Sequence, residues 1–141
     1  MAITKLEAAS VQLERAITLF FEEDYLCSLT LAGAAEEILG RISKREGKEV
    51  AVDYIAEFHA NDAAGGAFEG MKKNSIINAL NASRNSAKHA NDPDEKTVEV
   101  GLIDALQMLM RAVPMARSFL GDTEKMAALH AWIKDHPEVR G

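Results

Sequence analysis

Apolar residues recur at steps of three and four along most of this chain, which is the period of α-helices with one buried face. The first stripe falls in residues 4–22 and consists of Leu6, Ala9, Leu13, Ile17 and Phe20. The second falls in residues 24–46 and consists of Leu26, Leu29, Ala32, Leu39 and Ile42. Asp24 is placed to begin the second helix and Gly47 to end it. The pattern predicts two helices joined by a short turn.

The remaining segments also follow the helical period. We expect a short helix over residues 48–59, a loop over 61–66 and a helix over 67–90. Asp92 as N-cap and Pro93 at the first helical position predict a long helix over 93–120, which Pro114 should kink. Its buried face is predicted to consist of Leu102, Leu106, Leu109 and Val113. A short last helix should follow Gly121, with Met126, Leu129, Trp132 and Ile133 on its apolar side.

No segment has the alternating pattern of a strand. The expected fold is therefore all-α: four main helices in an up-and-down bundle with one or two short helices, and residues 1–141 as a single domain. The chain has 48% apolar and 27% charged residues, as globular proteins do. Without a secretory signal or a membrane span, and with one cysteine, we expect a cytoplasmic protein.

Charge narrows the classes of partner. The formal net charge of −6 argues against a protein that coats long nucleic acid. Residues 71–91 nevertheless contain four basic residues and no acidic one: Lys72, Lys73, Arg84 and Lys88. This basic segment leaves room for a local phosphate site.

A row of asparagines runs along the same segment. At about 100° per residue, Asn74, Asn78, Asn81 and Asn85 fall within about 60° of one another, opposite Ile76, Leu80, Ser83 and Ala87. Each asparagine costs about 0.6 kcal/mol of helix propensity relative to alanine. The row is either a hydrogen-bonding wall for a phosphodiester, with Arg84 and His89 on its two shoulders, or a solvated face without a role.

The segment from Arg84 to His89, RNSAKH, resembles the Arg-polar-x-x-x-His signature of HEPN domains (higher eukaryotes and prokaryotes nucleotide-binding). Four residues separate the arginine from the histidine, and Asn85 fills the polar position. Residues 16–40, with the run LAGAAEEIL, are similar to the first helical hairpin of many HEPN-like proteins. The resemblance spans roughly residues 13–119 and excludes the last helix.

The resemblance implies a metal-independent endoribonuclease that acts on RNA phosphodiesters as a homodimer, with no cofactor and with an antitoxin-like protein as a further partner. His89 would be the general acid and base, Arg84 would stabilise charge on the phosphate, and Asn85 would orient the pair. Asn78, Asn81 and Lys88 would bind the substrate. Because many HEPN-like domains do not cleave RNA, the alternative is a non-catalytic module that binds a nucleotide or a protein. A third alternative is a helical protein unrelated to the family.

Other candidate groups lie outside this segment. One of Glu36 and Glu37 should point inward, where it either pairs with Arg84 or simply reaches solvent. Cys27 is expected to be a buried small hydrophobe and His130 a surface residue. No two of the four histidines have metal-site spacing, so no metal is expected. Trp132 could anchor a dimer contact.

Overall fold

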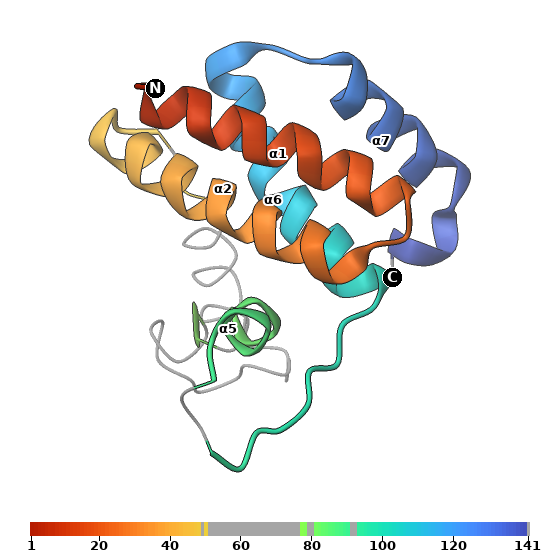
Figure 1. The fold of residues 1–141 in the computed structure, drawn as a ribbon. Helices are drawn as coiled ribbons and strands as arrows, with labels where there is room; N and C mark the ends of the chain where they lie inside the picture. The colour runs from red at the N-terminus through yellow and green to blue at the C-terminus, as the bar shows by residue number, and fades with distance from the viewer. Residues whose placement is uncertain (49, 51–76, 79–80, 91–92, 141) are drawn as a thin grey trace, which may run out of the picture.

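Helices are the only regular elements in the part of the chain that the computed structural model describes, residues 1–48, 50, 77–78, 81–90 and 93–140 (Figure 1). In chain order they are α1 (Lys5–Phe21), α2 (Tyr25–Arg45), α5 (Ala82–Lys88), α6 (Leu102–Leu120), α7 (Glu124–Asp135) and the 3-10 helix η1 (Pro137–Arg140). The all-α fold class is thereby confirmed.

The starts of α1 and α2 follow from local capping. The Thr4 hydroxyl accepts from the Glu7 N–H, and the Glu7 carboxylate accepts from the Thr4 N–H, which is a complete capping box. The Asp24 carboxylate accepts from the Cys27 N–H at 3.1 Å. Both helices therefore begin within one residue of the positions that the sequence predicts.

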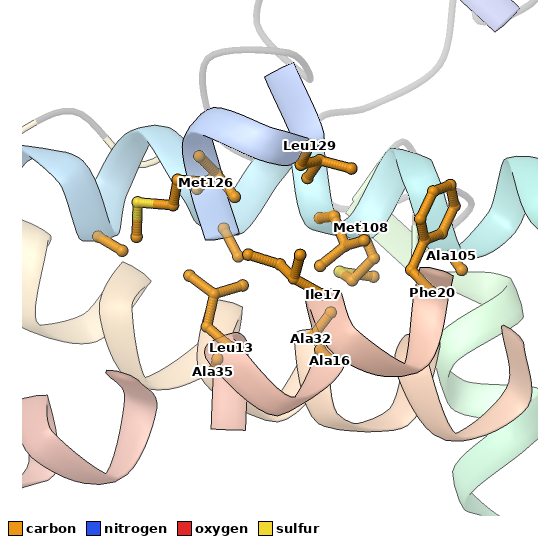
Figure 2. Packing of buried hydrophobic residues seen from close by; sticks show 14 of the residues in the cluster. Leu13, Ala16, Ile17, Phe20, Ala32, Ala35, Ala105, Met108, Met126 and Leu129 are labelled. Carbon is orange, nitrogen blue, oxygen red and sulfur yellow. The ribbon is translucent and has the colours of Figure 1, made fainter. Parts of the chain in front are cut away.

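Three long helices, α1, α2 and α6, form most of the core, and α7 adds Met126 and Leu129 to it. Figure 1 shows α1 and α2 as an antiparallel hairpin lying in front of α6. In the same view α7 and α5 lie on opposite sides of this hairpin. Figure 2 shows small alanines between larger side chains, which lets the helix backbones approach closely. Large side chains at the centre of the core with 2% exposure or less are Leu13, Ile17, Leu29, Leu39, Leu106, Leu109, Met126 and Leu129.

Two buried or half-buried hydroxyl groups tie helices together. The Ser28 hydroxyl donates to the Ala16 carbonyl at 2.8 Å across the α1–α2 hairpin. The Thr123 hydroxyl donates to the Glu14 carboxylate at 2.7 Å and also accepts from the Met126 N–H, so it caps α7 while joining α7 to α1.

The long helix predicted over residues 93–120 is wrong at its start. Residues 93–94 form a turn, residues 95–100 are irregular, and α6 begins at Leu102. The β-branched Thr97, Val98 and Val100 disfavour helix, whereas the Asp104 carboxylate accepts from the Gly101 N–H at 2.9 Å and fixes the true start. The helix continues through Pro114, and the kink stays a prediction.

Two residues predicted to be buried in α2 are exposed. Leu26 is 48% exposed and Cys27 is exposed as well, because both lie in the first turn of α2, at the end of the bundle. The predicted helix over 48–59 and the loop over 61–66 lie outside the described residues. In the segment 67–90, residues 77–78 and α5 are helical. No helix in the described ranges is long and apolar enough to cross a membrane.

Leu109→Ala should lower the free energy of unfolding by about 2–5 kcal/mol, since it removes a fully buried side chain from the centre of the core. The matched control is Met110→Ala, the next residue along α6, whose side chain is 47% exposed and whose loss should cost within about 0.5 kcal/mol. Urea unfolding of both variants tests the position of the core, and equal losses would contradict it.

Candidate functional site

One carboxylate is shared by two guanidinium groups between α2, α5 and α6. Glu36 Oε2 lies 3.1 Å from Arg84 Nη1, and Glu36 Oε1 lies 2.8 Å from Arg111 Nη2. The side chains of Glu36, Arg84 and Arg111 are only 4%, 13% and 7% exposed. Of the two alternatives for the acidic pair, the inward one is confirmed: Glu36 pairs with Arg84, while Glu37 stays half-exposed.

Asn81 completes this polar cluster. Its side-chain oxygen accepts from Arg111 Nη2 at 2.9 Å, and the residue is 9% exposed. Asn81 stands at the N-cap position of α5 but makes no side-chain capping bond, because its amide is turned toward Arg111 instead. Asparagine is a favourable N-cap residue, but the side chain of Asn81 bonds to the buried Arg111 instead of capping α5.

The Arg84 side chain reaches Glu36 by lying directly over Gly33 of α2. A Cβ atom added at Gly33 would be 2.5 Å from Arg84 Cδ and 2.7 Å from Cγ. Only glycine leaves space for this crossing, which accounts for the break in the alanine run of α2.

A cleft of about 290 Å³ opens beside the cluster. Among its described lining residues four are basic and two acidic, a formal surplus of two positive charges: Arg41, Lys44, Arg84, Arg111, Glu36 and Glu37. Asn81, Gly40 and Val50 complete the described lining. Guanidinium groups held in place by a carboxylate are suited to binding an oxyanion, since their donors are already oriented.

The predicted asparagine row divides in the structure. Asn78 and Asn85 are exposed, whereas Asn81 faces the interior; Asn74 lies outside the described residues. The straight exposed wall is therefore wrong at Asn81, the N-cap residue of α5, whose side-chain oxygen accepts from Arg111. Ser83 and Ala87, predicted to face the core, are half-buried.

The first and last residues of the RNSAKH motif lie in different surroundings. Arg84 lines the cleft, but His89 is the exposed C-cap of α5 with extended backbone and is not one of the described cleft residues. Lys88 is exposed, and its Nζ lies 3.8 Å from Glu37 Oε2. Asn85, the residue after Arg84, is exposed as well. Asn85, Lys88 and His89 are thus all exposed, and Lys88 reaches Glu37 at the edge of the cleft.

Polar contacts link α5 to its described neighbours, and none of its residues is fully buried. Besides the Arg84–Glu36 pair, the Ser83 hydroxyl donates to the Asp104 carboxylate at 2.8 Å. The Ser86 hydroxyl donates to Glu95 at 3.1 Å. Ala87 of α5 also packs against the core, so polar contacts and partial apolar burial together position α5.

Sequence reasoning missed Arg111. It is the only charged residue between Asp104 and Arg117, and the buried Met108 and Met115 stand three residues before it and four after it. A lone arginine on the apolar face of a helix is the signal that could have found it, since a buried charge needs a partner.

The remaining candidates carry less chemistry. Hydrogen bonding to the Asp24 carboxylate raises the pKa of the exposed Cys27 thiol, which disfavours the thiolate nucleophile. His130 is exposed, as predicted. Trp132 packs edge-to-face on Phe20 with ring centroids 5.1 Å apart, and a dimer contact there stays a prediction. No group of metal-ligating side chains is present among the residues described.

No protein-family model, curated protein or solved structure matches this chain. The resemblance to HEPN domains therefore rests only on the RNSAKH segment and on residues 16–40.

Glu36→Gln should lower the free energy of unfolding by about 3 kcal/mol or more, because it removes the carboxylate that the two buried guanidinium groups share. Glu37→Gln is the matched control: its carboxylate is 43% exposed, and its ion pairs are the long ones to Arg41 and Lys88 at 3.9 Å and 3.8 Å, so the cost should stay below about 1 kcal/mol. Thermal and urea unfolding measure both, and a loss that is no larger for Glu36→Gln would contradict the arrangement.

Gly33→Ala should destabilise the protein, although alanine is normally the better helix former by about 1 kcal/mol. The reason is the collision with Arg84. In an Arg84→Ala background the same change should become neutral or stabilising, because the nearest remaining Arg84 atom, Cβ, lies at 3.8 Å. A double-mutant cycle by urea unfolding gives the coupling between the two positions. If the two changes in the free energy of unfolding simply add, the Arg84 side chain does not lie over Gly33.

Proposed function

We propose that this chain is a HEPN-like helical module that binds the phosphate of a nucleotide in the cleft between α2, α5 and α6. The observation that carries the proposal is the state of Arg84. Its guanidinium lines the cleft, is held by one oxygen of Glu36, and has a buried Nε without a hydrogen-bond partner among the described residues. Because Arg84 shares the single carboxylate of Glu36 with Arg111, a phosphate beside the guanidinium would supply a second negative charge.

The wider cleft supports the same ligand. Arg41 and Lys44 add positive charge at its exposed side: Arg41 lies about one turn before the end of α2, and Lys44 lies in its last turn. A volume of about 290 Å³ suits a small molecule better than a polymer. The net charge of −6 also favours a compact anion over a long one, which the rest of the surface would repel.

Endoribonuclease activity is the second candidate, and the exposed residues of α5 favour it. His89, Lys88 and Asn85 are each exposed, so a second copy of the chain or an RNA strand can reach them. The HEPN resemblance implies a dimer in which two such motifs meet. In a single chain, however, His89 does not line the cleft that holds Arg84, so binding requires fewer assumptions than cleavage.

Titration calorimetry with adenosine 5′-monophosphate, inorganic phosphate and adenosine in EDTA tests the binding proposal. The monophosphate should bind and adenosine should not, because the phosphate makes the charged contacts. Arg84→Gln should weaken binding at least about ten-fold, the usual value of a charge-assisted pair. Arg15→Gln, an exposed arginine of α1 outside the cleft, should leave binding unchanged. Full affinity in a folded Arg84→Gln protein would overturn the proposal.

Incubation with RNA in EDTA separates the two candidates. A binding module leaves the RNA intact. A HEPN nuclease cleaves it, and His89→Ala abolishes cleavage without changing the folded state or nucleotide binding. Cleavage that survives both His89→Ala and Arg84→Ala would come from a contaminant.

A further inference from the structure

A second pocket lies between α6 and α7, away from the cleft at α5. Its volume is about 500 Å³, within the range of sites for small organic ligands. None of its described lining residues belongs to α2 or α5, and α7 lies outside the segment that resembles HEPN domains. Any role for this pocket is therefore independent of the proposed nucleotide site.

The wall of the pocket is apolar. Met126 and Leu129, which Figure 2 shows extending from α7 into the core, form its floor. Two methionines give the wall a shape that adapts to a flexible ligand. The apolar lining residues are Met110, Val113, Pro114, Met126, Leu129 and Ile133.

The polar residues at the pocket are all basic ones. Arg117, His130 and Lys134 are the polar members of the described lining, and no acidic residue is among them. Arg117 is partly neutralised by Asp122 at 3.3 Å, so Lys134 is the main fixed charge. An apolar wall with a basic rim is complementary to a ligand that has an apolar body and one anionic end.

The spacing along α7 fixes the length of that ligand. Met126 and Lys134 are eight residues apart, which is about 12 Å at 1.5 Å per residue, or the length of an extended chain of roughly ten carbons. Leu129 and Ile133 line the path between them. A carbon chain lying along α7 would thus place its charged end at Lys134.

Pro114 gives a second reason to regard this pocket as more than loose packing. A proline inside a helix costs about 3 kcal/mol, because it removes an N–H and crowds the preceding turn. Pro114 lines the pocket, and the carbonyl that loses its helical donor belongs to Met110, another lining residue. The cost of the proline therefore falls on the wall of the pocket.

We infer that the α6–α7 pocket binds an aliphatic monoanion of about ten carbons, with its carboxylate at Lys134. Decanoate, decanol and butyrate are the probes, measured by calorimetry and by the fluorescence of Trp132, the one tryptophan of the chain, next to the lining residue Ile133. Decanoate should bind saturably with one site per chain. Decanol, without the charge, and butyrate, without the apolar length, should each bind at least about ten-fold more weakly.

Lys134→Glu should weaken decanoate binding by at least about ten-fold. Lys134→Arg, which keeps the positive charge, should bind decanoate as the unchanged protein does. Lys125→Glu is the matched control, because Lys125 is an exposed lysine of the same helix that does not line the pocket. Equal binding of decanol and decanoate, or full affinity in Lys134→Glu, would overturn the inference. A Lys134→Glu variant that binds decanoate normally but dissociates an oligomer in sedimentation would show that a second copy of the chain occupies the pocket instead.

Discussion

The carboxylate of Glu36 is the point on which the arrangement of α2, α5 and α6 depends. It is nearly buried and receives Arg84 from α5 and Arg111 from α6, so a single side chain holds two other helices in register with α2. A buried ion pair is costly unless its geometry satisfies both partners. Here the same contacts that position α5 also orient the basic wall of a cleft, which links the stability of this region to its chemistry.

Local chemistry explains why the sequence predicts some elements well. Capping by Thr4 and Asp24 depends on residues three positions away, and the apolar stripes of α1 and α6 repeat regularly, so their buried faces follow from the sequence. Pro93 is an ambiguous signal, because it suits a turn as well as a first helical position. The β-branched residues after Pro93 disfavour a helix there, and the spacing of apolar residues does not contain that information.

The candidate site shows where such reasoning ends. The motif identifies Arg84, and the sequence does not decide whether the acidic pair Glu36 and Glu37 supplies a partner for Arg84 or only reaches solvent. Arg111 and Glu36 are 75 residues apart, and no local pattern states that they touch. Asn81 illustrates the same limit, since helical periodicity assigns it to an exposed row, whereas the demand of Arg111 for an acceptor turns it inward.

The hydroxyl of Thr123 both caps the first turn of α7 and grips Glu14 of α1. This double attachment acts as a pivot at one end of the helix. A small tilt of α7 about that pivot moves its far end most, and the distal Ile133 and Lys134 would swing relative to α6 while the anchor stays intact. Because Trp132 near the same end packs on Phe20 of α1, such a tilt would also displace an aromatic contact with the hairpin, so the width of the groove is coupled to the packing of α1.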